Sequence, residues 1–179
     1  MILRKSIHAE ITSIKPFDEK ERKTQFDVLD WIDSGVEIFR IAKPATPAKH
    51  LVSYFAVIDN DYILLVDHIN AQMWLPTGGH VEPDEHPRET VLREVKEELG
   101  IEGKFLQETP VLITSTKTVG KTKGHTDVCL WYVLKGDKNE ALDFDRTEFY
   151  QIRWFHKNDV PMDRTDPEMS RFLSKLFKD

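Results

Sequence analysis

Three glutamates near the middle of the chain have a spacing that could bind a divalent cation. If Pro87 to Leu99 is a helix, Glu94, Glu97 and Glu98 lie within about 100° of one another around its axis, because each residue advances by about 100°. Like charges this close repel one another. A hard cation such as Mg²⁺ reverses the repulsion, since it prefers oxygen ligands shared with substrate phosphates. The competing interpretation is an ordinary solvated charged surface.

Neighbouring residues fit a metal or phosphate site. Gly78 and Gly79 precede the helix, and without side chains they let the main chain approach a bound ion or phosphate. Arg93 adjoins Glu94 and precedes Glu97 by four residues, so it could orient either carboxylate through a charge-assisted hydrogen bond. We expect Arg93 to position a carboxylate rather than to react.

The complete segment from Gly79 to Ile101 resembles the Nudix box. It has a glycine, five residues, a glutamate, seven residues, Arg-Glu, an aliphatic residue, one residue, Glu-Glu, one residue, a glycine and an aliphatic residue. Trp74 to Gly79 and Ile152 to Phe155 are also similar to Nudix sequences, so the resemblance extends over about Leu51 to Asp179. It favours the functional interpretation of the glutamates over the solvated surface.

This resemblance implies an α/β fold, a Nudix-type α/β/α sandwich around a mixed sheet. It also implies roles for particular residues. The metal ligands would be Glu94, Glu97, Glu98 and the carbonyl of Gly78, with Glu85 as a supporting carboxylate and Arg93 as the orienting catalytic group. Mg²⁺, or Mn²⁺ in its place, would be the cofactor, and no organic cofactor is implied.

The implied reaction is attack of water on phosphorus in a phosphoanhydride bond of a nucleoside triphosphate or another nucleoside diphosphate derivative. Two alternatives remain open: a Nudix-fold sensor that binds a nucleotide without cleaving it, and an isopentenyl-diphosphate-type isomerase. The isomerase would need a catalytic cysteine, and the single cysteine, Cys129, lies in an apolar run. The signatures of ADP-sugar and NADH pyrophosphatases that we sought are absent, so the sequence does not identify the nucleotide.

The general base is a second open choice. Some Nudix enzymes resemble one another in drawing a further metal ligand or the general base from a loop before the late strand. In this sequence that loop is residues 135–150. Glu148 lies closest to the strand Ile152 to Phe155, so we select it as a catalytic candidate. The alternative is that Glu94 is the base and Glu148 is an ordinary loop glutamate.

The composition limits the partners. A formal net charge of −6 over 179 residues argues against a nucleic acid polymer or an anionic membrane as partner. No segment approaches the roughly 18 apolar residues of a membrane helix, and one cysteine cannot form an internal disulfide. We therefore expect a cytoplasmic protein whose partner is a small-molecule nucleotide.

The order of elements predicts one Nudix domain over residues 51–179, preceded by a helical N-terminal extension with a proline-containing linker over residues 1–50. The arm has helical spacing from Ser6 to Ile14 and from Asp18 to Ser34. It could cover the domain, shape a pocket or pair two chains into a homodimer. Further strands are expected at Leu51–Ile58, Tyr62–His68, Val111–Val119, Val128–Leu134 and Ile152–Phe155, and a last helix capped by Asp166-Pro167 extends to Phe177.

Other residues are weaker candidates. Trp74, Trp131 and Tyr132 could stack on a nucleobase, although aromatic residues in such positions are more often core. His80, His86 and His125 receive no role, because no pair has the sequence spacing of a zinc site.

Overall fold

The computed structural model describes residues 2–43, 46–118 and 124–178. Within these residues, strands form one mixed sheet in the order β3-β2-β1-β6-β5, with β4 paired to β1 and β7 paired to β2. The strands are β1 (Lys49–Asp59), β2 (Tyr62–His68), β3 (Met73–Leu75), β4 (Thr77–His80), β5 (Leu112–Lys117), β6 (Thr126–Lys135) and β7 (Phe149–His156). The helices are α1 (Ile2–Ser13), α2 (Glu19–Asp33), α3 (Pro87–Leu99), the 3-10 helix η2 (Met162–Arg164) and α4 (Met169–Leu176).

The long strand β1 organises the sheet. One edge of β1 pairs in parallel with β6 from Lys49 to Ile58. Its other edge is divided, because the first half pairs antiparallel with β4 and the second half pairs antiparallel with β2. This division brings the glycines of β4 beside the middle of β1.

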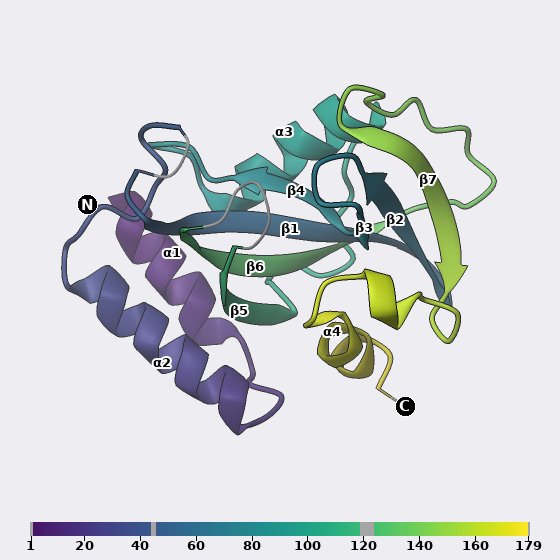
Figure 1. Ribbon diagram of the computed structural model, residues 1–179. Coiled ribbons are helices and arrows are strands. Elements are labelled where there is room, and N and C mark those ends of the chain that lie inside the picture. Colours follow the sequence, from purple (N-terminus) through teal and green to yellow (C-terminus); the bar gives the residue numbers. More distant parts are fainter. Residues whose placement is uncertain (1, 44–45, 119–123, 179) are drawn as a thin grey trace.

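Helices cover both faces of the sheet, which gives the predicted α/β/α sandwich (Figure 1). Successive side chains of a strand point to opposite faces. Leu51 and Phe55 of β1 therefore pack in a core with residues of α1, α2 and α3. Val52 and Ala56 pack on the opposite face, in a core that includes Met169 of α4.

The N-terminal extension is helical, as predicted, and α1 and α2 contribute to the same core as α3. A buried glutamate, Glu21 of α2, joins this arm to the edge of the sheet. Its Oε1 accepts a hydrogen bond from the main-chain N–H of Ile113 on edge strand β5 at 3.3 Å, and another from Nζ of Lys175 at 2.7 Å. Glu21 thus satisfies a buried main-chain donor on an edge strand, where the neighbouring strand that would otherwise pair with it is missing.

Some element boundaries differ from the predicted ones. No strand was predicted between His68 and Pro87, but this stretch contains β3 and β4. The last helix begins at Met169 with Glu168 as its N-cap, because Asp166 instead accepts a hydrogen bond from the N–H of Glu168 in the preceding turn. Strand β5 ends at Lys117, and the predicted end at Val119 lies outside the described residues. Among the described helices, none is both long and apolar enough to cross a membrane.

Candidate active site

Helix α3 is held at both ends by local signals in the sequence. At its N-terminus, Nδ1 of His86 accepts a hydrogen bond from the N–H of Arg88, and Glu89 accepts one from the N–H of His86 at 2.8 Å. Pro87 occupies the first turn, where its missing N–H causes no loss. At the other end, Gly100 has φ of 68°, a left-handed conformation that suits glycine. The helix therefore spans Pro87–Leu99, as predicted.

The buried stripe of α3 sets which carboxylates face the sheet. Val91, Val95 and Leu99 are fully buried in the core. This orientation leaves the side chain of Glu94 only 15% exposed, whereas that of Glu97 is 63% exposed. Glu98 is also buried. Glu94 and Glu98 thus face β4, and Glu97 faces solvent.

A guanidinium group holds one of these glutamates in place. Nη1 of Arg93 donates to Oε1 of Glu94 at 2.6 Å, while its Nε and Nη2 donate to the two oxygens of Glu85 at 2.9 and 3.0 Å. Burial raises the pKa of Glu85, but hydrogen bonds from Arg93 and Thr90 outweigh burial and leave the pKa below its ordinary value. Glu85 is therefore a firm anchor for Arg93, and Arg93 fixes the carboxylate of Glu94.

The two glycines of β4 leave the space that this arrangement needs. A β-carbon on residue 79 would lie 1.9 Å from Oε1 of Glu94. A β-carbon on residue 78 would lie 2.1 Å from the carbonyl oxygen of Ser53, and Gly78 has φ of 150°, which side chains rarely permit. The N–H of Gly78 donates to Oε2 of Glu98 at 3.2 Å. The main chain of β4 therefore lies directly against the carboxylates of α3.

Glu148, which is far from the box in sequence, lies in a loop that contacts α3. The loop before β7 is tied to α3 because the N–H of Asp145 donates to the carbonyl of Glu98 at 2.9 Å. Burial raises the pKa of Glu98 to about 9, and the charges of Glu94 and Glu148 contribute to this rise. Burial also raises the pKa of Glu94, with a contribution from Glu97 and Glu148. The charges of Glu97 and Glu148 thus act on the carboxyl groups of α3 that face β4, and they add to the cost of ionising those groups.

The sequence of this region matches a known family model. The NUDIX domain model matches residues 49–176, which includes β1, the glycines of β4 and the carboxylates of α3. The chain belongs to the Nudix family. It is a Nudix hydrolase, and the resemblance of its box to the family's is confirmed.

Two curated Nudix relatives are similar in sequence. The asymmetrical bis(5'-nucleosyl)-tetraphosphatase of Mus musculus is 30% identical over 120 residues, which cover 67% of this chain and 75% of the mouse protein. The CTP pyrophosphohydrolase of Escherichia coli strain K12 is 44% identical over 52 residues, which cover 26% of this chain and 38% of that protein.

Solved structures agree on the Nudix fold. The MutT NUDIX hydrolase from Burkholderia pseudomallei has a TM-score of 0.56 at 20% identity, covering 70% of this chain and 96% of its own. A NUDIX-family hydrolase from Clostridium perfringens has a TM-score of 0.55 at 21% identity, covering 71% and 97%. The shared part is the sheet with its flanking helices.

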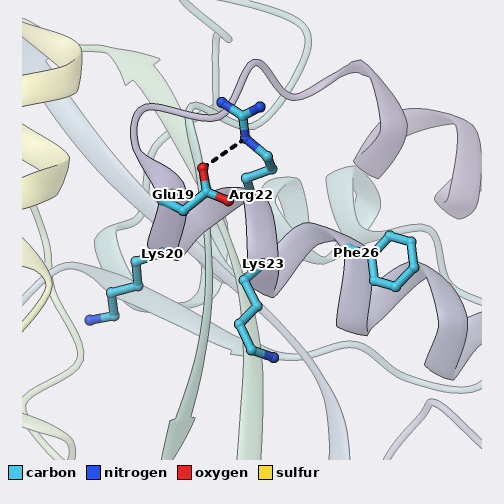
Figure 2. Close-up of a pocket in the computed structure, with 5 residues that line it drawn as sticks. All are labelled: Glu19, Lys20, Arg22, Lys23 and Phe26. Atoms are coloured by element: carbon cyan, nitrogen blue, oxygen red, sulfur yellow. Dashed lines mark ion pairs between the residues drawn. The ribbon is translucent and has the colours of Figure 1, made fainter.

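Other predicted candidates lie away from the box. Trp74, Trp131 and Tyr132 are buried in the two cores and are not exposed for stacking on a base. A surface hollow is lined by Glu19, Lys20, Arg22, Lys23 and Phe26. Figure 2 shows that these side chains come from one helix, with Glu19 paired to Arg22. Because the hollow lies along the outer side of α2 and has no residue of the box, we assign it no role.

Sequence reasoning missed one group of polar side chains. His80 and His125, which were given no role, come together with His50 and Asp127 at the start of β1. His50, His80 and Asp127 belong to three different strands and His125 directly precedes β6, so no local spacing reveals their proximity. Only the pairing of β1 with β4 and β6 brings them together.

Proposed function

We propose that this Nudix hydrolase uses Mg²⁺, or Mn²⁺, to cleave a phosphoanhydride bond in a nucleoside triphosphate or another nucleoside diphosphate derivative. The observation that carries the proposal is the position of Glu94. Its carboxylate lies in the space left by Gly79 and is fixed by Arg93, while the charges of Glu97 and Glu148 act on it. This concentration of oxygen ligands suits a hard divalent cation.

The donor set fits Mg²⁺. The carboxylates of Glu94, Glu97 and Glu98 and the carbonyl of Gly78 would hold the ion, and all four groups come from β4 and the last two turns of α3. When bound, Mg²⁺ neutralises charge on the phosphoryl oxygens and helps to place the attacking water. The raised pKa values of Glu94 and Glu98 follow from burial and mutual repulsion, which a divalent cation opposes.

The remaining steps belong to the side chains of the protein. Arg93 orients Glu94, and Glu85 anchors Arg93. As the oxygen of the water attacks phosphorus, a carboxylate accepts a proton from that water. The bond between phosphorus and the oxygen of the leaving phosphate breaks. Glu148 is our candidate for this base, because its charge acts on both Glu94 and Glu98 and its exposed position is accessible to water. Glu94 is the alternative.

The isomerase alternative is disfavoured by the position of the cysteine. Cys129 is the single cysteine of the sequence, lies within β6 and is 3% exposed. Burial also raises the pKa of its thiol well above the ordinary value, so it is a poor proton donor or nucleophile. The sensor alternative is disfavoured by the complete carboxylate set. We retain hydrolysis as the proposed activity.

The substrates to test follow from the relatives. Because the similar mouse and E. coli proteins are named for a dinucleoside tetraphosphate and for CTP, we propose small nucleotides of these two classes. We further propose that residues 51–179 are the catalytic domain and residues 1–50 an arm, with a homodimer as one role for the arm. A nucleic acid polymer is not expected, given the net charge of −6.

A nucleotide panel tests the proposal. The protein is incubated with nucleoside triphosphates, dinucleoside polyphosphates and isopentenyl diphosphate, with Mg²⁺, Mn²⁺ or excess chelator. We expect metal-dependent cleavage of at least one nucleotide into a nucleoside monophosphate plus pyrophosphate, orthophosphate or another phosphorylated fragment, which for a dinucleoside polyphosphate is a second nucleotide. In ¹⁸O-water the label should enter a phosphate group. Label only in a sugar or base product, or isomerisation of isopentenyl diphosphate without hydrolysis, contradicts the proposal.

A further inference from the structure

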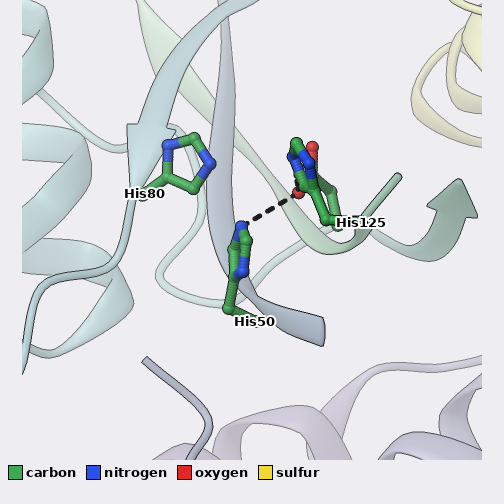
Figure 3. A group of neighbouring side chains, drawn as sticks. His50, His80 and His125 are labelled. Carbon is green, nitrogen blue, oxygen red and sulfur yellow. Dashed lines mark ion pairs between the residues drawn. The ribbon is translucent and has the colours of Figure 1, made fainter. Parts of the chain in front are cut away.

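Three histidines and an aspartate converge at one end of the sheet, on the face opposite α3. His50 pairs directly with Asp127 across the parallel strands β1 and β6, so both side chains point to the same face. His125 precedes Asp127 by two residues, and His80 pairs with Val52, two residues after His50. One potential ligand atom from each of the four lies within 4.8 Å of the others. Figure 3 shows the imidazoles of His50, His80 and His125 around a common space.

This cluster differs from the box glutamates in position and in chemistry. A β-carbon on Gly79 would point at Glu94 of α3, so the next side chain along β4, that of His80, points to the other face. The box offers oxygen atoms alone, whereas this cluster offers three imidazoles and one carboxylate. Imidazole nitrogen suits zinc and similar transition metals, whereas Mg²⁺ prefers oxygen.

Two buried atoms in the cluster have unused bonding capacity. Nε2 of His50 lies 3.2 Å from Oδ1 of Asp127, and the side chain of His50 is fully buried. Neither atom has a hydrogen-bond partner within residues 2–43, 46–118 and 124–178. Burying such atoms unpaired is unfavourable, so each calls for a partner such as a bound ion.

The tautomer of His50 favours a cation as that partner. Nδ1 of His50 lies 2.8 Å from the carbonyl oxygen of Pro47, which can only accept, so Nδ1 carries the hydrogen. In the neutral ring, Nε2 then presents a lone pair to the carboxylate of Asp127. Nε2 of His125 also lies 3.2 Å from Oδ1 of Asp127. A carbonyl that fixes the far nitrogen of a histidine is the usual outer-shell partner of a metal-binding imidazole.

We infer that His50, His80, His125 and Asp127 form a binding site for one zinc-type transition metal ion, separate from the carboxylate site of the box. Zinc lies about 2.0 to 2.2 Å from such ligands, so two donors on a tetrahedral ion are roughly 3.4 Å apart. The two distances of 3.2 Å to Asp127 match this spacing. Three imidazoles and one carboxylate complete four-coordination.

Arg40 competes with the ion for one ligand. Nη1 of Arg40 lies 3.2 Å from Nε2 of His80, and because arginine only donates, this nitrogen accepts. Metal binding must displace Arg40 or overcome its charge. Removing that charge should therefore tighten binding.

Metal titration of the full chain tests the inference. The protein is stripped with chelator and titrated by calorimetry with Zn²⁺, and by visible absorption with Co²⁺, in excess Mg²⁺ to occupy oxygen sites. We expect one ion per chain and the intense absorption of tetrahedral Co²⁺. Asp127→Asn and His125→Gln should each weaken Zn²⁺ binding by at least about 100-fold, the upper limit for losing an outer-shell partner. Arg40→Met should strengthen it.

Matched variants separate this site from the proposed function. His86→Gln removes a histidine outside the cluster and should retain Zn²⁺ binding, as should Glu97→Gln, which changes the box. Circular dichroism checks that Asp127→Asn and His125→Gln remain folded. Unchanged affinity in these two variants, no Zn²⁺ bound in excess Mg²⁺, or the weak spectrum of octahedral Co²⁺ would overturn the inference. No readout uses hydrolysis, so failure of one proposal leaves the other standing.

Discussion

Oε1 of Glu94 lies 1.9 Å from the point where a β-carbon on residue 79 would stand. The glycine in β4 and the glutamate in α3 are therefore complementary. Nη1 of Arg93 donates a hydrogen bond to the same oxygen at 2.6 Å. A side chain at position 79 would force the carboxylate of Glu94 out of the position that Arg93 fixes, because the atoms it meets belong to the Glu94 side chain.

Gly79→Ala tests this relationship. We expect the variant to fold and to lose activity by about 10²-fold or more, the scale for removing one well-placed electrostatic group. The measurement is kcat/KM in the wild type, Gly79→Ala, Glu94→Gln and the double variant. If Gly79 acts through Glu94, its replacement should cost little further activity in the Glu94→Gln background. Equal losses in both backgrounds would show that Gly79 acts in another way.

Glu97→Gln and Glu98→Gln test the metal ligands. Each change removes a negative oxygen from the stripe on α3, so Mg²⁺ binding should weaken and activity should fall by at least about 10²-fold. In chelator, the melting temperature of Glu97→Gln should stay constant or rise, because repulsion among the carboxylates decreases. That of Glu98→Gln should stay constant at neutral pH, because Glu98, with a pKa of about 9, already holds a proton there. Glu102→Gln, beyond the end of α3 with an 80% exposed side chain, is the control and should remain near wild type. Full activity in both ligand variants would remove these residues from the site.

Glu10 gives the protein a stability that depends on pH. Its carboxyl accepts a hydrogen bond from the hydroxyl of Tyr132 at 2.9 Å and lies 3.7 Å from Nε2 of His86, while Arg88 contributes a charge nearby. Burial raises its pKa from 4.5 to about 7, and the Tyr132 bond and Arg88 reduce this rise. The folded protein therefore holds a proton on Glu10 that the unfolded chain releases. This contribution is fully present below about pH 4.5 and is lost as pH rises through about 7.

Glu10→Gln should remove that part of the pH dependence. The difference in unfolding free energy between the wild type and the variant should change by on the order of 3 kcal/mol between pH 4.5 and 8, since one pKa unit corresponds to about 1.4 kcal/mol. Urea unfolding at several pH values measures it. Glu19→Gln, at an 85% exposed side chain of α2, should follow the wild type. Parallel curves for Glu10→Gln and the wild type would contradict the expected proton uptake.

The sequence predicts α3 well because local signals mark that helix, and it does not predict β4 because that strand has no such signals. Proline at position 87, glycine at position 100 and a 3.6-residue apolar period all indicate the same helix. Strand β4 has four residues, two of them glycine, so it has no apolar alternation to recognise. Its place depends on pairing with β1, which is a tertiary contact.

The register in which β1 and β6 pair also explains why the sequence alone does not predict the histidine cluster. His50 and Asp127 are 77 positions apart, and they meet because β1 and β6 pair in parallel in one register. A shift of one residue would turn each side chain to the other face. The box differs, because Glu94, Glu97 and Glu98 follow one another along one helix. Sequence spacing is therefore enough to find the box and not enough to find the cluster.

The sequence alone predicts Glu148 less directly than the box glutamates and more directly than the histidine cluster. Its place in the sequence made it a candidate, and the hydrogen bond from Asp145 to the carbonyl of Glu98 shows how its loop reaches α3. Its charge raises the pKa of both Glu94 and Glu98, although burial is the larger cause in each case. A base at this point would take a proton from water without surrendering a metal ligand.

If Glu148 is the base, Glu148→Gln should lower kcat by about 10²- to 10⁴-fold, the scale of general base catalysis. The affinity for Mg²⁺ should change little, because the ligands on α3 remain. The kcat should be measured over a range of pH, since loss of the base also removes its acid limb. Glu140→Gln, an exposed glutamate in the same loop, is the matched control. Activity of Glu148→Gln within about threefold of wild type would assign the role to Glu94, because proton transfer then proceeds without the loop carboxylate.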